Sequence, residues 1–345
     1  MIDLRSDTIS MPTKEMLMSI LSAKLGDDGR TNENGRGEDL ATNQLEDKAA
    51  ELTGKEAAVL FPSGTMANTA AIMSICHPAD KVLVGKIQHI YTVEKALFDS
   101  SIGQMIPITY QLNARGVPDI DDMRRLIKQE NIKLITYENT HNSNGGSCVS
   151  LPDMEAIYNL SREFNIPIHL DGARIFNAAT ALKTPVAELC RYVDSVMFCI
   201  SKGLGCGIGS ILCSNVSTAK QAREKRRLLG GAMRQTGIIA AQGLYALENN
   251  VKSLALDHEN AAMFADSLKK LKYTKVKGSV ETNIVMLDIS ATGLTLKEYC
   301  RKANELGLLI RPSGDGIRLV FYRDIDKIST ERAAQIIKTL DETVA

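Results

Sequence analysis

The sequence predicts an α/β protein built as a three-layer sandwich around a mostly parallel sheet, followed by a small C-terminal α+β domain. From about residue 56, short apolar runs rich in β-formers alternate with longer amphipathic stretches. Helical segments of this length between strands favour parallel pairing with right-handed crossovers. The 345 residues, 44% hydrophobic and 24% charged, are enough to bury a core without disulfide or metal support.

The larger unit is expected to hold strands and helices in alternation. We predict strands at residues 57–61, 81–84, 133–137, 167–170, 195–200 and 210–213. We predict helices between them at residues 65–76, 119–130 and 152–164. Only a short glycine-rich loop precedes the last strand, so this strand can pair antiparallel with its neighbour.

The two ends of the chain follow other patterns. A helix with proline near its start is expected over residues 12–25, and then a mobile loop rich in glycine and charge over residues 26–39. A long helical stretch over residues 236–266, with a break near Asn249, leaves the larger unit. The order after it is β-α-β-β-α, at residues 282–288, 296–306, 308–311, 317–322 and 328–343.

Charge and cysteine content exclude several classes of protein. The chain carries 41 Lys and Arg residues and 41 Asp and Glu residues, a formal net charge of +0. This balance argues against a nucleic-acid or acidic-membrane binder and favours a small neutral or zwitterionic substrate. The seven scattered cysteines form no CxxC pair, which indicates reduced thiols and no zinc site of that kind. The N-terminus is charged at once and no apolar stretch reaches about 18 residues, so we expect a soluble cytoplasmic protein without a membrane partner.

Ligands of open parallel α/β sheets bind at the carboxyl ends of the strands, and four predicted strand ends carry polar residues. The first, Ser63-Gly64-Thr65, turns from a strand into a helix, where free backbone N–H groups can hold a phosphate. The same turn is also an ordinary helix N-cap. The second is the polar run 138–146, in which His141 lies in mid-loop and indicates a site rather than a surface histidine.

The third and fourth strand ends carry an aspartate and a lysine. Asp171 shares one strand face with His169, and a carboxylate that leaves a buried strand needs a partner. That partner is either Arg174, in a structural salt bridge, or the protonated ring nitrogen of a ligand. Lys202 follows the buried run 195–200, where desolvation favours a neutral amine able to form a Schiff base. The alternative is a lysine that reaches solvent from a glycine-rich turn.

Four alternating glycines follow Lys202 and permit close approach of a flat ligand. They do not form a dinucleotide fingerprint, because they run into a strand rather than a helix. Taken in order, a phosphate turn, the Asp171 carboxylate and the Lys202 amine describe a pyridoxal 5'-phosphate (PLP) site. In such a site the lysine forms the Schiff base, the carboxylate keeps the pyridine nitrogen protonated, and the helix end holds the phosphate.

Six runs of the chain resemble the low-specificity L-threonine aldolases, which are fold-type-I PLP enzymes of the β-eliminating lyase group. The runs are DLRSDT at 3–8, FPSGTMAN at 61–68, ENTHN at 138–142, HLDGARIFNAA at 169–179, SKGLG at 201–205 and GGAMRQ at 230–235. The resemblance follows the family's order and implies the PLP-dependent transferase fold. We therefore divide the chain into an N-terminal helix and active-site loop (1–45), a large PLP-binding α/β domain (46–248) and a small C-terminal α+β domain (249–345).

The resemblance also implies roles for single residues. The catalytic set would be Lys202, His89, His141 and Asp171. The cofactor would lie against Ser63, Gly64, Thr65, His89, Asp171, Arg174, Ser201, Lys202 and Arg234, with His89 stacked on its ring. The substrate carboxylate would be held by Ser6, Arg174 and Arg318. Because Arg318 lies in the small domain, that domain has a reason to close over the site.

Members of this family are dimers of dimers with shared active sites, so the resemblance implies a homotetramer. Arg234 matches a residue contributed across a subunit interface; the alternative is a solvated residue beside the basic run 223–227. Two departures from the family pattern are expected to alter the substrate pocket. Arg36 takes the place of a tyrosine in a longer loop, and Phe321-Tyr322 stand where Thr-His is usual.

The activity implied is retro-aldol cleavage of β-hydroxy-α-amino acids such as L-threonine or L-allo-threonine to glycine and an aldehyde. His89 or His141, directly or through water, would take the β-hydroxyl proton. The same site could serve β-elimination, transamination or racemisation. The alternative from another class is a metal-dependent aldolase or hydrolase with His89, His141, His169 and Asp171 as ligands, although we expect no metal. A purely structural role would leave a buried lysine and aspartate without a purpose.

Overall fold

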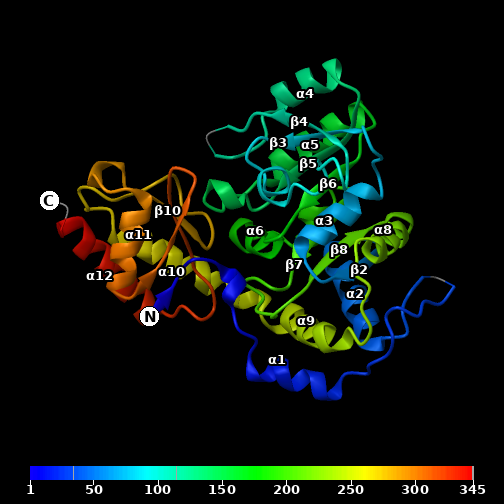
Figure 1. The fold of residues 1–345 in the computed structure, drawn as a ribbon, viewed down its shortest axis with the longest axis horizontal. Helices are drawn as coiled ribbons and strands as arrows, with labels where there is room; N and C mark the ends of the chain where they lie inside the picture. The colour runs from blue at the N-terminus through cyan, green and yellow to red at the C-terminus, as the bar shows by residue number, and fades with distance from the viewer. Residues whose placement is uncertain (34, 114, 344–345) are drawn as a thin grey trace.

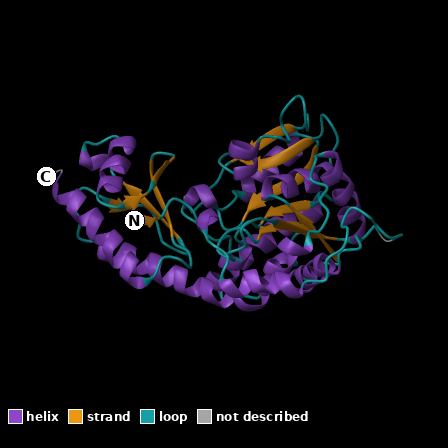
Figure 2. Ribbon diagram, turned by 60° about the horizontal axis from the view of Figure 1, so that its bottom comes forward, coloured by secondary structure: helices purple, strands orange, loops and turns teal. Residues whose placement is uncertain are grey.

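The protein is seen in a computed structural model that describes residues 1–33, 35–113 and 115–343. Two lobes are joined by a long helical connection (Figures 1 and 2). The larger lobe holds a seven-stranded sheet among these residues, and the smaller lobe holds a four-stranded sheet. The site described below lies at the edge of the larger sheet that faces the small lobe's arginines.

The larger sheet has the strand order β2-β8-β7-β6-β5-β3-β4. Its strands are β2 (Ala57–Phe61), β3 (Lys81–Gly85), β4 (Ile106–Tyr110), β5 (Ile132–Glu138), β6 (Ile168–Asp171), β7 (Ser195–Cys199) and β8 (Ser210–Ser214). All neighbouring pairs are parallel except those of β8, which runs antiparallel to both β7 and β2. The mostly parallel sheet and the antiparallel pairing of the last strand are therefore confirmed.

Helices cover both faces of this sheet. Successive residues of a strand point to opposite sides, so each strand contributes side chains to an apolar layer on either face. Along β2, Val59 and Phe61 pack into one apolar cluster, whereas Ala58 and Leu60 pack into another. The first cluster includes side chains of α3 (Gly64–Met73) and α8 (Val216–Leu228). The second includes those of α2 (Leu40–Thr53), α6 (Ile175–Leu182), α7 (Val186–Cys190) and α9 (Gly237–Asn249). The predicted three-layer sandwich is thus confirmed.

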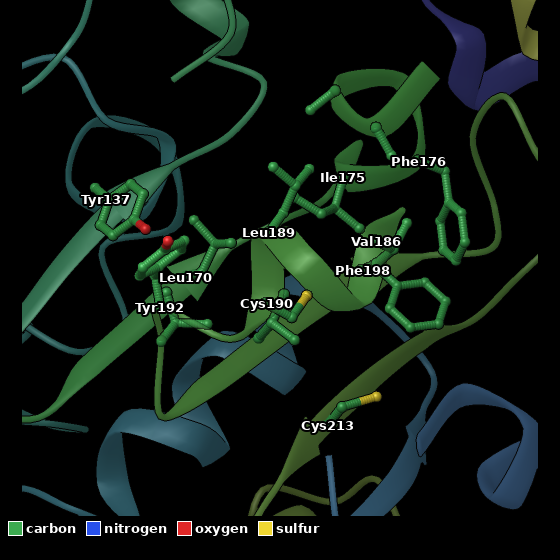
Figure 3. Packing of buried hydrophobic residues seen from close by; sticks show 14 of the residues in the cluster. Tyr137, Leu170, Ile175, Phe176, Val186, Leu189, Cys190, Tyr192, Phe198 and Cys213 are labelled. Atoms are coloured by element: carbon green, nitrogen blue, oxygen red, sulfur yellow. The ribbon is translucent and has the colours of Figure 1, made fainter. Parts of the chain in front are cut away.

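The second cluster is the main core of the larger lobe (Figure 3). The rings of Phe176 and Phe198 meet edge to face there, with centroids 5.1 Å apart. Cys190 and Cys213 lie in the same core, and all seven cysteines are free thiols, as the sequence indicates. Burial raises the pKa of the Cys190 thiol to about 12, so this side chain behaves as a small apolar group.

The N-terminal helix is shorter than the sequence predicts. Helix α1 spans Lys14–Ser19 and continues as a 3₁₀ turn over Ile20–Ser22. It begins there because the Thr13 hydroxyl caps it by accepting the amide N–H of Met16 at 3.1 Å, which leaves Pro12 outside the helix. The following loop, residues 26–39, has no helix in its described part, as predicted.

The connection and the small lobe follow the predicted order with two differences. A short strand at Lys275–Val276 was not predicted, and the strand predicted at 308–311 is divided: Leu308–Leu309 pairs with the N-terminal strand, and Arg311–Ser313 joins the small sheet. Helix α9 ends at Asn249, a 3₁₀ turn follows at Val251–Ser253, and α10 (Leu254–Ser267) continues, so the predicted break is confirmed. The small sheet has the antiparallel order β12-β13-β10-β9. Its elements are β9 (Lys275–Val276), β10 (Ile284–Asp288), α11 (Leu296–Glu305), β12 (Arg311–Ser313), β13 (Gly316–Val320) and α12 (Lys327–Thr343).

The first residues of the chain also belong to the small lobe. Strand β1 (Ile2–Asp3) pairs in parallel with β11 (Leu308–Leu309). The chain then crosses to the larger lobe, which brings Ser6 and Asp7 to the boundary between the two. No helix in the described ranges combines the length and the apolarity needed to cross a membrane.

Candidate active site

A cavity of about 470 Å³ opens at the carboxyl ends of the parallel strands. The register sets Glu138 of β5 beside Asp171 of β6, and Asp171 beside Met197 of β7, so all three reach the same edge. Most residues predicted for the site line this cavity: Ser6, Ser63, Gly64, Thr65, His89, Asp171, Arg174, Ser201, Lys202 and Arg318. His141 and Arg234, both predicted, do not.

The predicted phosphate turn forms the start of α3. The Ser63 hydroxyl caps the helix by accepting the amide N–H of Met66 at 3.2 Å. The amide N–H groups of Gly64 and Thr65 have no hydrogen-bond partner in the described part of the chain. A side chain at Gly64 would place its Cβ 3.1 Å from Cys199 Sγ, so glycine lets the turn approach the sheet. The turn is thus both an N-cap and an open pair of donors for an anion.

Lys202 lies in the turn that follows β7 and is half-buried rather than enclosed, because the cavity is open to solvent there. It is the only lysine among the described residues of the cavity wall, and its side-chain amine forms no salt bridge or hydrogen bond with a described residue. Of the four glycines after it, Gly207 lines the cavity, whereas the other three pack closely against protein side chains. A Cβ at Gly205 would meet Arg323, and a Cβ at Gly209, whose φ is +116°, would meet Ile200 at 2.9 Å.

Asp171 is a buried carboxylate whose partners in the described chain are all neutral. Its Oδ1 accepts the amide N–H of Ala173 at 3.1 Å, and its Oδ2 accepts from Asn68 Nδ2 at 3.2 Å. Arg174 does not pair with it: its Nε and Nη2 each donate to Asp7 at 2.7 Å. The structural salt bridge considered for Asp171 is therefore absent from the described residues, and a cationic ligand atom remains as the partner.

Asn68 is held in place by two further buried polar residues, His169 and Ser195. His169 Nε2 lies 3.0 Å from Asn68 Oδ1, and His169 Nδ1 lies 2.8 Å from Ser195 Oγ. Burial lowers the pKa of His169 to about 4, although Asp171 opposes this, so the ring is neutral at pH 7. The shared face predicted for His169 and Asp171 is confirmed, since both contact Asn68.

A guanidinium that has no carboxylate partner among the described residues faces the cavity from the small lobe. Arg318 is 2% exposed, and its Nη1 donates to Asn142 Oδ1 at 2.6 Å. Its Nε is buried without a partner in the described ranges, and no described carboxylate forms a salt bridge with it. Burial lowers the pKa of Arg318 below its ordinary value, and the nearby Arg174 and Arg311 lower it further. This side chain therefore favours an anion from outside the chain.

His89 joins two carboxylates that the sequence did not single out. Its Nδ1 lies 3.0 Å from Glu94 Oε1, and its backbone N–H donates to Glu138 Oε2 at 3.0 Å. Glu138 also accepts the amide N–H of Asn142 at 2.8 Å, which fixes the polar loop against the cavity. Burial opposes a charge on His89, yet the hydrogen bond to Glu94 and the nearby acids raise its pKa.

His141 is placed differently from the prediction. It is 2% exposed, pairs with Ser147 in an isolated bridge, and neither of its ring nitrogens has a partner in the described chain. It does not line the cavity of this chain, and its predicted role as a base stays a prediction. The metal-ligand set considered as an alternative is not assembled among the described residues, because both nitrogens of His169 are engaged and His141 does not line the cavity. The described group with ligand-like spacing is His89, Glu94 and Asp171.

Arg234 and the departures from the family pattern lie outside the cavity wall. Arg234 is exposed and pairs with Asp27 at 3.2 Å, and its role across an interface stays a prediction. Arg36 pairs with Asp47 at 2.9 Å. Phe321 is fully buried beside Phe264 in the small-lobe core. These residues therefore do not shape the substrate pocket of this single chain directly.

The basic run 223–227 contributes two arginines to ion pairs within the larger lobe. Arg226 is buried and pairs with Asp28, and Arg223 pairs with Glu46 at 2.7 Å. A second cavity of about 650 Å³ is lined in part by Ser143, Asn144 and residues of the small lobe. It lacks both Lys202 and Asp171, so the chemistry belongs to the smaller cavity.

Comparison with known proteins places this site in a family. The chain matches the β-eliminating lyase family over residues 3–292. The chain belongs to that family. The low-specificity L-threonine aldolase of Escherichia coli (strain K12) is 38% identical to this chain over 342 residues, which cover 97% of both chains. Low-specificity L-threonine aldolase 1 of Arabidopsis thaliana is 35% identical over 335 residues, 94% of this chain and 92% of that one.

Solved structures confirm the fold-type-I architecture for this chain. A threonine aldolase from Leishmania major covers the whole of both chains with a TM-score of 0.79 at 17% identity. A putative L-allo-threonine aldolase from Listeria monocytogenes gives a TM-score of 0.76 at 22% identity, over 98% of this chain and 96% of that chain. The resemblance found in the sequence runs is therefore confirmed at the level of family and fold.

Proposed function

We propose that this protein is a PLP-dependent aldolase that cleaves β-hydroxy-α-amino acids of the L-threonine or L-allo-threonine type to glycine and an aldehyde. One observation carries the proposal. The buried Asp171 carboxylate has no cationic partner among the described residues, and it lines the same cavity as the unpaired Lys202 amine. A carboxylate and an amine left unpaired in one cavity need a ligand that satisfies both.

The residues present fit PLP. Gly64 and Thr65 offer two unpaired N–H donors at a helix N-terminus for the phosphate, and Lys202 offers the amine for the aldehyde. Asp171 offers its carboxylate to the ring nitrogen, and His89 a flat ring on the cavity wall. Ser63, Ser201, Arg174 and, from a neighbouring subunit, Arg234 complete the proposed cofactor site. When bound, PLP withdraws electrons from the bond broken at Cα.

The chain's own residues would orient the amino acid and handle its protons. Arg318 binds the substrate carboxylate, with Ser6 and Arg174 nearby, and this contact decides which bond at Cα is aligned for cleavage. His89 takes the proton of the β-hydroxyl group as the Cα–Cβ bond breaks and the aldehyde leaves. Cα then gains a proton, and the remaining product is glycine.

Glycine release tests the proposed function. Purified protein loaded with PLP is incubated separately with L-threonine and L-allo-threonine, and glycine and acetaldehyde are measured. We expect glycine and acetaldehyde in equal amounts from at least one of the two. No glycine, with the visible absorbance of bound PLP intact, would contradict the aldolase and leave β-elimination, which a 2-oxo acid and ammonia from L-serine would reveal.

Replacing Arg318 with glutamine is expected to raise KM for L-threonine about 10- to 100-fold with a smaller change in kcat, because a charged hydrogen bond to the carboxylate is lost. Steady-state glycine release measures both constants. Arg301→Gln, which removes an exposed arginine paired with Glu305, is the matched control and should leave KM unchanged. If KM stays the same in Arg318→Gln as well, the carboxylate is held elsewhere.

The proposed enzyme is a cytoplasmic homotetramer, a dimer of dimers whose active sites are shared between subunits. Two features support this arrangement. All seven cysteines are free thiols, which suits a reducing compartment. Arg234 is exposed in the single chain, with a side chain 69% accessible, and it forms a surface ion pair with Asp27 that it would exchange for a contact in a neighbouring cavity. Light scattering after size-exclusion chromatography would overturn the tetramer by giving the mass of one chain.

A further inference from the structure

The cavity wall contains a histidine–carboxylate pair with an unusual second support. Glu94 ends a π-helical turn that begins directly after His89, and this turn brings its Oε1 to 3.0 Å from His89 Nδ1. The side chain of Glu94 is 4% exposed, whereas that of His89 is 32% exposed. Glu94 lines the cavity beside His89 and contacts the imidazole at Nδ1, while no described residue forms a hydrogen bond with His89 Nε2.

Asn68 fixes the carboxylate from the opposite side. Its Nδ2 donates to Glu94 Oε1 at 3.0 Å and to Asp171 Oδ2 at 3.2 Å. The amide cannot be reversed, because its oxygen would then face two carboxylates while its nitrogen faced His169. Glu94 Oε2 is buried without a hydrogen bond to any described residue, so Oε1 makes all the polar contacts of this carboxylate.

We propose that Glu94 is a positioning residue for His89, which keeps the ring proton on Nδ1 and leaves Nε2 as the nitrogen available to the substrate's β-hydroxyl group. The position of the proton follows from the pair alone. The use of Nε2 as the base rests on the proposed aldolase function. Such a pair acts like other histidine–carboxylate pairs, in which the carboxylate selects the tautomer and strengthens the base.

The charges around the pair favour this arrangement. Three acids face His89: Glu94 on its own turn, Asp171 on β6 and Glu138 on β5. Burial opposes the imidazolium, but these acids together raise the pKa of His89. Burial and Asp171 raise the pKa of Glu94, while the hydrogen bond from His89 lowers it. When the imidazolium loses a proton, the one nearest the Glu94 carboxylate is retained, and Nε2 becomes the free base.

Nuclear magnetic resonance of the protein without PLP tests the tautomer directly. The chain has five histidines, so the ring nitrogens of protein labelled with ¹⁵N-histidine can be followed with pH, and His89→Gln identifies the signals of His89. In the wild type we expect the neutral ring to carry its proton on Nδ1. In Glu94→Gln we expect a lower pKa for His89. In Glu94→Asp we expect the pKa of His89 to lie between those of Glu94→Gln and the wild type. Glu305→Gln, which removes an exposed carboxylate, should change neither property.

A neutral wild-type ring protonated on Nε2, or an equal His89 pKa in wild type and Glu94→Gln, would overturn the proposal. Circular dichroism melting of each variant shows that it is folded before it is compared. These outcomes do not depend on catalytic activity. The NMR result therefore stands or falls separately from the proposed aldolase.

Activity gives a second readout on the PLP-loaded enzyme. We expect kcat of Glu94→Gln to fall about 10- to 100-fold with little change in KM, as for other residues that orient an active-site histidine. The base must be unprotonated to act, so the rate rises with pH through the pKa of His89. Because Glu94→Gln lowers that pKa, the acidic limb of kcat/KM should move to lower pH. If the acidic limb of kcat/KM stays at the same pH while the pKa of His89 measured by NMR moves, His89 is not the base.

Discussion

Replacing Lys202 with alanine is expected to abolish glycine release from L-threonine, with a loss of at least about 10³-fold. The reason is local. Lys202 is the only lysine among the described residues that line the cavity, so no other described side chain there can supply a primary amine to an aldehyde. The turn after β7 holds it at the edge where Asp171 also ends its strand. Glycine assays at saturating PLP measure the loss.

Borohydride reduction gives an independent measurement of the same role. Wild-type protein treated with PLP and then borohydride should gain one cofactor per chain in intact mass spectrometry, and Lys202→Ala should gain none. Lys269→Ala is the control, because Lys269 is exposed and pairs with Asp266 on the surface. Full labelling of Lys202→Ala would assign the covalent linkage to another amine and sink the site as described.

The sequence located the main groups of the cavity because parallel strands impose a common edge. Ser63, Asp171 and Lys202 are far apart in the chain, but each follows a strand of one sheet. A single rule, that ligands bind at the carboxyl ends of such strands, was enough to bring them together. The antiparallel β8 could also be predicted, since its loop is too short for a crossover.

The partner of Arg174 could not be predicted in this way. Arg174 follows Asp171 by three residues, which favoured a local salt bridge, but it pairs with Asp7, 167 residues away. Asp7 reaches it because β1 first joins the small lobe and the chain then returns across the boundary. A pairing of this kind depends on the path of the whole chain, and no spacing in one sequence records it.

Glu94 and Asn68 were missed for a different reason. Glu94 follows His89 by five residues, a spacing that neither a regular helix nor a strand places on one side, and only a π-helical turn brings the two together. Asn68 lies within the run that was assigned to phosphate binding. Its neighbours in the sequence do not indicate that its amide faces two carboxylates instead. His141, in contrast, looked functional from its polar neighbours, yet the loop folds its ring inward.

The missed elements of the fold have equally specific causes. Strand β4 contains Pro107 and an exposed Ile106, which weaken the pattern of a buried strand, and it is tolerated because it is the edge of the sheet. Helix α6 starts within the run that the family resemblance covers, so its apolar residues were assigned to a motif and not to an element. Helix α8 is rich in Lys and Arg and carries only a narrow apolar side.

Replacing Asp171 with asparagine is expected to lower kcat about 10²- to 10³-fold, because a fixed negative charge is removed from the position where positive charge must be kept on the ligand. The replacement also cannot satisfy its neighbours. Oδ1 and Oδ2 each accept a hydrogen bond, from Ala173 N–H and from Asn68 Nδ2, and an amide nitrogen in either position would face another donor. Steady-state glycine release and PLP absorbance measure both effects.

The covalent linkage should survive in Asp171→Asn, since Lys202 is unchanged, and KM for L-threonine should change little, since Arg318 still holds the carboxylate. This pattern is the reverse of that expected for Arg318→Gln, so the two variants separate the electronic role from the binding role. Asp315→Asn, at an exposed carboxylate paired with Lys277, is the matched control. Near-normal kcat in Asp171→Asn would mean that the buried carboxylate has only a structural partner in Asn68, and the charge argument for the cofactor would fail.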